Sequence, residues 1–120
     1  ILLVEDEEAV RNLVRRVLAA TGYTVLTAAN GGEALLICEA HQGEIDLMLT
    51  DVVMPGISGP ALARRLAPLQ PAMRVVFMSG YARDEELDLA DAPLLDKPFT
   101  VDALVSRVRS MLEPTSSTRA

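Results

Sequence analysis

The stretch that decides the fold reads Leu47-Met48-Leu49-Thr50-Asp51-Val52-Val53-Met54-Pro55-Gly56-Ile57-Ser58-Gly59. Its first residues form a short apolar run that is typical of a buried strand, and the run ends abruptly in the carboxylate of Asp51. The turn residues that follow lead the chain off the sheet and into a helix. Asp51 is therefore predicted at the carboxyl end of a strand, where open α/β sheets place their ligand chemistry.

Four further apolar runs alternate with helical patterns, so that strands are expected over residues 1–4, 23–28, 45–50, 74–79 and 94–95. Strands that alternate with helices need crossover connections, and continuous apolar strands are typical of a parallel sheet covered on both faces. The sequence thus predicts an α/β fold, a flavodoxin-like (βα)5 three-layer sandwich with a parallel sheet of order 2-1-3-4-5.

The helical patterns also predict which side chains are buried. The first helix should bury an apolar face made of Val10, Leu13, Val14, Val17 and Leu18, with Arg11, Arg15 and Arg16 on its other face. A short acidic helix is expected over 84–90, and Thr100 should cap the last helix. Cys38 and the methionines at 48, 73, 78 and 111 are expected to fill the core, whereas His41 should be solvated.

Length and charge limit the class of protein. The 120 residues fit one domain, expected over residues 1–113, with a disordered tail over 114–120. A net charge of −6 argues against direct binding of nucleic acid, and no apolar run approaches the ~20 residues of a membrane span. A single cysteine fits the reducing cytoplasm. Because the sequence lacks an initiating Met, we expect a piece of a longer polypeptide.

Polar side chains follow four of the apolar runs. Glu5 and Asp6 follow the first run, Asp51 ends the third, Ser79 ends the fourth, and Lys97 follows the fifth. All are expected at the carboxyl ends of parallel strands, and therefore at one edge of the sheet. Three carboxylates this close repel one another unless a cation lies among them. Oxygen ligands without His or Cys favour a hard ion, and Mg²⁺ fits best.

These residues supply the parts of a phosphoryl-transfer site. Asp51 is the predicted nucleophile, which would become an aspartyl phosphate. Lys97 offers a positive charge and Ser79 a hydroxyl donor for the phosphoryl oxygens. Each residue alone has an ordinary explanation, such as a turn aspartate or a surface lysine, so the prediction rests on their combination.

The chain resembles the receiver domain of two-component response regulators over essentially its whole length. The matching pieces are Leu3-Val4-Glu5-Asp6, Thr50-Asp51-Val52-Val53-Met54-Pro55-Gly56, Met78-Ser79-Gly80-Tyr81-Ala82 and Lys97-Pro98-Phe99. The resemblance implies that Asp51 accepts a phosphoryl group from a phosphohistidine, carried by a sensor histidine kinase or a histidine phosphotransfer domain. Such a domain catalyses its own Mg²⁺-dependent phosphorylation, without being a turnover enzyme, and then switches conformation or relays the phosphate.

The resemblance also implies the metal ligands. Asp6 and Asp51 would contact Mg²⁺, Glu5 would act through a water molecule, and Val53 would offer its backbone carbonyl. Ser79 and Lys97 would hold the phosphoryl oxygens. The Lys97-Pro98 peptide is expected to be cis, as in the family, which would aim the ammonium group inward.

The sequence departs from the family pattern in the segments through which a phosphorylated receiver passes on its signal. Leu94 stands where the family usually has Phe or Tyr, and the segment between Ser79 and Lys97 is several residues short, at the expense of the fourth helix. Both features slightly favour a relay of phosphate to a phosphotransfer domain. The Ser-Gly-Tyr-Ala stretch at 79–82 resembles receivers that are fused to hybrid sensor kinases.

Two other functions fit the sequence less well. A degenerate receiver would act as a phosphorylation-independent interaction module, but every site residue is intact. A hydrolase of the haloacid dehalogenase type needs a second Asp two residues after its nucleophile, and here that residue is Val53. The apolar Val53 also cannot orient an attacking water, which predicts a long-lived phosphoryl group. The sequence does not identify the partner kinase or the domain architecture of the parent protein. It also leaves the oligomeric state open, and a homodimer is one of the options.

Overall fold

The computed structural model describes residues 1–41, 43–79 and 94–112. Strands and helices follow one another in the order β1 (Leu2–Val4), α1 (Glu8–Ala20), β2 (Leu26–Ala28), α2 (Gly31–Ala40), β3 (Leu47–Asp51), α3 (Gly59–Leu66), β4 (Arg74–Ser79), β5 (Leu94–Asp96) and α4 (Val101–Leu112). Every strand pairing is parallel, and the sheet order is β2-β1-β3-β4-β5. The predicted α/β fold and its strand order are confirmed.

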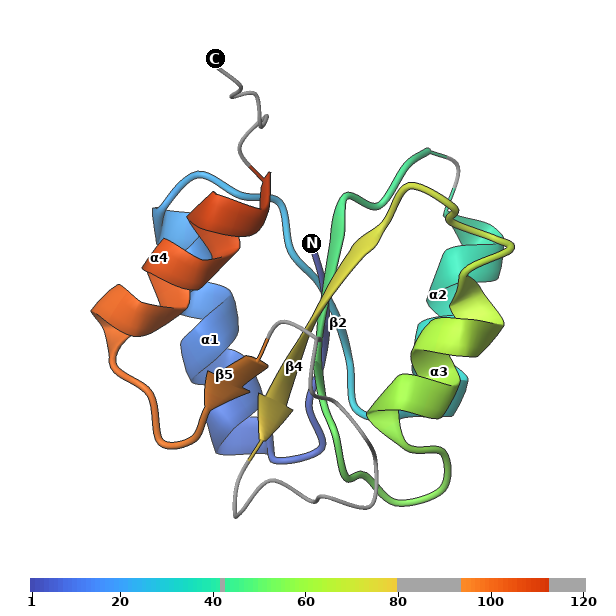
Figure 1. Ribbon diagram of the computed structural model, residues 1–120, viewed down its shortest axis with the longest axis horizontal. Helices are drawn as coiled ribbons and strands as arrows, with labels where there is room; N and C mark the ends of the chain where they lie inside the picture. The colour runs from blue at the N-terminus through green and yellow to red at the C-terminus, as the bar shows by residue number, and fades with distance from the viewer. Residues whose placement is uncertain (42, 80–93, 113–120) are drawn as a thin grey trace.

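The sheet lies between two layers of helices. Figure 1 shows α1 and α4 on one face of the sheet, and α2 and α3 on the other. Successive strand residues face opposite sides, so an apolar strand supplies both cores. One core contains Leu2, Val4 and Met48, and the other contains Leu3, Leu47 and Leu49. This arrangement explains why the strands read as continuous apolar runs and confirms the three-layer sandwich.

Polar side chains cap the starts of α2, α3 and α4, whereas Glu7 at the start of α1 makes no side-chain cap. Asn30 caps α2 by accepting a hydrogen bond of 2.9 Å from the N–H of Glu33. Ser58 caps α3 at 3.3 Å, and Pro60 occupies its first turn, where a missing N–H has no cost. Thr100 accepts a hydrogen bond of 3.0 Å from the N–H three residues later, as predicted. These caps mark the starts of three helices that follow the carboxyl edge of the sheet.

Two strands start later than predicted, because other partners take up the backbone N–H groups before them. The second strand starts at Leu26 and not at Tyr23, whose N–H donates to Leu18 in the turn that ends α1 (3.1 Å). The third strand starts at Leu47, because the N–H of Ile45 donates to the side-chain oxygen of Gln70 (2.9 Å). Two strands also extend one residue beyond their predicted ends, so that β3 includes Asp51 and β5 includes Asp96.

Most burial predictions are confirmed. Cys38, Met48 and Met78 are buried, Met73 and Met111 pack against the two cores, and His41 is exposed. Leu13 is an error, since it is 55% exposed on α1. The predicted helix over 84–90, the motif residues 80–82 and the expected tail over 114–120 lie outside the described residues. Within the described part of the chain, no helix combines the length and apolar character that crossing a membrane requires.

Candidate functional site

The sheet brings the predicted site residues to its carboxyl edge. Glu5 follows β1 and donates its N–H to the carbonyl of Ala28 at 3.1 Å, which continues the pairing with β2. Asp51 ends β3 and lies opposite Met78 of β4. Lys97 follows β5 and donates its N–H to the carbonyl of Ser79 at 2.8 Å. The backbone ladder therefore sets the positions of all these side chains.

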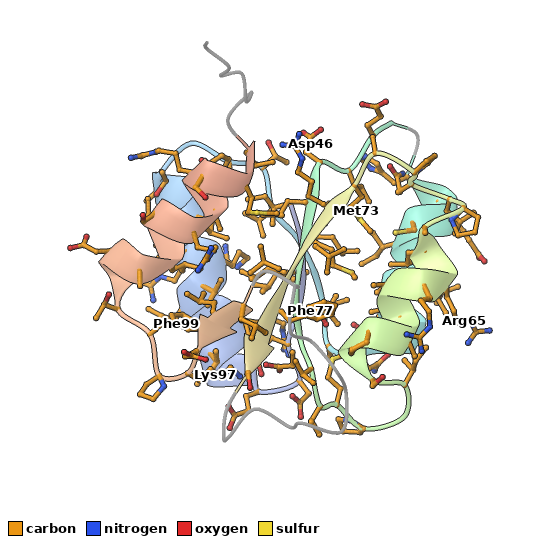
Figure 2. All side chains as sticks on the ribbon, viewed as in Figure 1. Asp46, Arg65, Met73, Phe77, Lys97 and Phe99 are labelled. Atoms are coloured by element: carbon orange, nitrogen blue, oxygen red, sulfur yellow. The ribbon has the colours of Figure 1, made fainter. Side chains whose placement is uncertain are left out.

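Lys97 joins two carboxylates that come from different strands. Its Nζ lies 2.9 Å from Oε1 of Glu5 and 2.8 Å from Oδ1 of Asp51. Figure 2 shows Lys97 at the end of the sheet to which β4 and β5 point. Glu5 is 0% exposed and Asp51 is 5% exposed, so the three charges meet in a largely buried place. The Lys97-Pro98 peptide is cis, as predicted.

Burial perturbs the ionisation of this cluster. The pKa of Asp51 is raised from 3.8 to about 7. Loss of water on burial is the largest cause and the neighbouring Glu5 adds to it, whereas the hydrogen bond from Lys97 opposes it. Burial alone would lower the pKa of Lys97, but its hydrogen bonds to Asp51 and Glu5 raise that pKa overall. One ammonium group therefore does not compensate the carboxylates fully, and a further cation would be stabilised here.

The donor atoms fit Mg²⁺. Glu5, Asp6 and Asp51 each offer a carboxylate oxygen, and these oxygens all lie within 4.8 Å of one another. A set made only of oxygen donors suits a hard cation. Both carboxylate oxygens of Glu5 already accept hydrogen bonds, from Lys97 and from the N–H of Glu7 (3.0 Å). Direct binding of a metal ion by Glu5 would therefore compete with these two hydrogen bonds.

The other two predicted site residues lie beside this cluster. Ser79 is 7% exposed at the end of β4, the strand next to Asp51. Val53 lies two residues beyond Asp51, in the loop that leads to α3, and is 70% exposed. The roles of the Ser79 hydroxyl and of the Val53 carbonyl remain predictions.

The sequence alone did not identify two further residues that shape the site. The N–H of Gly59 donates to the carbonyl of Val52 (2.9 Å), and a Cβ at Gly59 would lie 2.1 Å from the carbonyl oxygen of Asp51. Only a glycine lets α3 begin this close to Asp51. A glycine between a helix cap and a helix-starting proline was the available signal. Arg11, predicted on the polar face of α1, donates to the backbone carbonyl of Glu5 at 2.9 Å.

The sequence is similar to known receiver domains over nearly its whole length. A family model described as the response regulator receiver domain matches residues 1–109. The chain is 48% identical to the sensor kinase CckA of Brucella abortus over 118 residues, which cover 94% of the chain but only 12% of that kinase. It is 37% identical to the response regulator receiver protein CpdR of Brucella abortus, over 93% of the chain and 95% of CpdR.

Solved structures agree with these sequence matches. The receiver domain of the hybrid histidine kinase CckA is 43% identical and superimposes with a TM-score of 0.82, over 93% of this chain and 97% of that domain. The response regulator TrrA of Thermotoga maritima, crystallised with Mg²⁺ and BeF, is 32% identical with a TM-score of 0.78, over 92% and 96% of the two chains.

Proposed function

The chain belongs to the response regulator receiver domains of two-component signalling systems, and we propose that Asp51 is its phosphoacceptor. The observation that carries the proposal is the double contact of Lys97 with Glu5 and Asp51. A buried carboxylate at the end of a strand, with an ammonium group at hydrogen-bond distance, has both a nucleophilic oxygen and a charge that stabilises phosphoryl oxygens.

The proposed reaction transfers a phosphoryl group from a phosphohistidine. An oxygen of Asp51 attacks phosphorus, the new P–O bond forms as the P–N bond breaks, and the departing imidazole keeps the electron pair and takes up a proton. Lys97 then contacts the phosphoryl oxygens, and Ser79 donates its hydroxyl to them. Since these groups come from β3, β4 and β5, phosphorylation would change contacts between three neighbouring strands.

The proposed metal ligands are Asp6, Asp51 and the carbonyl of Val53, with Glu5 acting through a water molecule. Bound Mg²⁺ would neutralise the carboxylates and the charge on the phosphoryl oxygens. Without a further cation, a pKa of about 7 leaves much of Asp51 protonated near neutral pH, and a protonated carboxyl is a poor nucleophile. The dependence of the reaction on Mg²⁺ then follows from the burial of Asp51.

The proposed partner is a sensor histidine kinase or a histidine phosphotransfer domain, in the cytoplasm. A hybrid sensor kinase is the proposed parent, with residues 1–113 as its receiver domain. This assignment is supported by the higher identity to the sensor kinase CckA than to the single-domain protein CpdR. The apolar Val53, 70% exposed beside the acceptor, supports a long-lived phosphoryl group.

The test is intact-mass spectrometry after incubation with acetyl phosphate. Wild type should gain one phosphoryl group with Mg²⁺ and none with EDTA, Asp51→Asn should gain none, and the exposed control Asp46→Asn should behave as wild type. Val53→Asn should lose its phosphoryl group faster, because the amide can orient a water molecule. An unlabelled wild type would instead favour a phosphorylation-independent interaction module.

A further inference from the structure

Every backbone and side-chain polar group of Glu5 has a partner within the described residues. Its N–H donates to the carbonyl of Ala28 at 3.1 Å. Its carboxylate accepts hydrogen bonds from Lys97 at 2.9 Å and from the N–H of Glu7 at 3.0 Å. Its carbonyl oxygen accepts from Nη1 of Arg11 at 2.9 Å. Because Glu5 is 0% exposed, loss of a partner would leave a buried polar atom without its hydrogen bond, which is costly.

Arg11 reaches this carbonyl by turning back over the start of α1. Its own N–H donates to the carbonyl of Glu7 at 2.9 Å, which fixes its place on the helix. A guanidinium group is always charged and holds its donors in a rigid plane, so the bond to Glu5 is strong and directional. The loop between β1 and α1, residues 5–7, is thereby tied at one end to β2 and at the other end to α1.

Arg11 also counters the charge of an acidic loop. Four carboxylates follow one another over residues 5–8, and Asp51 lies beside the first two of them. Lys97 is the only lysine of the sequence, and it is shared between Glu5 and Asp51. Among the described residues, Arg11 is the second cationic side chain that contacts this loop.

We propose that Arg11 is a positioning residue for the metal site, which holds the Glu5 carbonyl so that the loop presents Asp6 to Mg²⁺. The inference rests on the proposed function, since it takes Mg²⁺ as the ion that the carboxylates bind. The sign of the effect separates this role from a simple charge effect. A nearby cation repels Mg²⁺, so loss of charge alone would tighten metal binding, whereas loss of a positioning contact weakens it.

The experiment measures the Mg²⁺ dissociation constant by NMR titration of the whole chain. Arg11→Met should bind Mg²⁺ about tenfold more weakly than wild type, as is usual when a contact that orients metal ligands is lost. Arg11→Lys should recover part of the affinity, because an ammonium group can still donate to the same carbonyl. Arg15→Met removes an equal charge from an exposed position of the same helix and should not weaken binding.

A second measurement needs no metal. The amide N–H of Glu7 is bonded to the Glu5 carboxylate, so its hydrogen exchange should be faster in metal-free Arg11→Met, while the amide of the buried Leu49 exchanges as in wild type. Unchanged exchange at Glu7 together with unchanged or tighter Mg²⁺ binding would overturn the inference and leave the proposed function intact. A wild type that titrates with Mg²⁺ no differently from Asp6→Asn would overturn the proposed metal site, and this inference with it.

Discussion

Replacing Asp51 with Asn is expected to make the metal-free domain more stable at pH 8. The carboxylate is 5% exposed, beside the fully buried Glu5, and burial raises its pKa from 3.8 to about 7. At about 1.36 kcal/mol per pKa unit, this shift means that the charge of Asp51 destabilises the folded protein by about 4 kcal/mol. The full cost applies at a pH where Asp51 is ionised in both the folded and the unfolded chain. The amide removes this cost, and its oxygen can still accept a hydrogen bond from Lys97. We therefore expect a gain of about 2 to 4 kcal/mol in the free energy of unfolding.

The gain should depend on pH with a definite sign. Between pH 3.8 and about 7, folded wild type keeps the Asp51 proton that the unfolded chain has released, so its stability falls as the pH rises. Above the folded-state pKa the full cost is present. At pH 5 the cost is only about 2 kcal/mol, and the advantage of Asp51→Asn should shrink accordingly. Mg²⁺ at pH 8 should stabilise wild type more than the variant, because it binds the ionised carboxylate.

Thermal and urea unfolding, followed by far-UV circular dichroism in EDTA, measures these differences. The midpoint of Asp51→Asn should lie roughly 10 °C above that of wild type at pH 8, and closer to it at pH 5. Asp46→Asn is the matched control, because Asp46 is exposed at the opposite end of the sheet (Figure 2). The reasoning would be refuted if Asp51→Asn were no more stable than wild type at pH 8, or if its gain in stability did not depend on pH. Either result would show that burying the ionised Asp51 carboxylate does not destabilise the fold.

Three further substitutions test separate contacts, each by urea unfolding. Lys97→Met should destabilise the domain by about 3 kcal/mol at pH 7, because Glu5 keeps a buried charge without its cation; an unchanged midpoint would contradict this. Gln70→Leu should cost about 2 kcal/mol through two lost hydrogen bonds to the loop before β3, and a neutral result would show that the loop does not need them. Gly59→Ala should cost about 1 to 3 kcal/mol and slow phosphorylation, since its Cβ would lie 2.1 Å from a backbone oxygen. Gly43→Ala, whose Cβ would have no neighbour nearer than 3.6 Å, should change neither, and equal effects would refute the steric argument.

The residues that local pattern alone can place were predicted correctly. A carboxylate at the end of an apolar run, followed by turn residues, located Asp51 at the edge of the sheet. The alternation of strands and helices indicated a parallel sheet, because parallel strands need crossover helices, and the order of the flavodoxin-like fold proved correct for it. Lys97 could be assigned to the same edge, since it follows a strand that runs parallel to the others.

The features that the sequence did not reveal depend on contacts that the local pattern of residues does not show. The start of β3 depends on Gln70, which lies 25 residues away along the chain and takes up the N–H of Ile45. Arg11 belongs to the polar face of its helix by periodicity, and only the path of the loop before the helix brings it to Glu5. The exposure of Leu13 is a similar case, because a helical period does not show how far the neighbouring elements extend.

The ammonium group of Lys97 offers the most direct test of the account. Because Lys97 is the only lysine, side-chain-labelled lysine gives one signal from the centre of the cluster. On addition of Mg²⁺ and acetyl phosphate, this signal should shift as the protein gains one phosphoryl group, and Asp51→Asn should show neither change. A wild type that gains the phosphoryl group while the Lys97 signal stays in place would contradict the assignment of this cluster as the phosphorylation site.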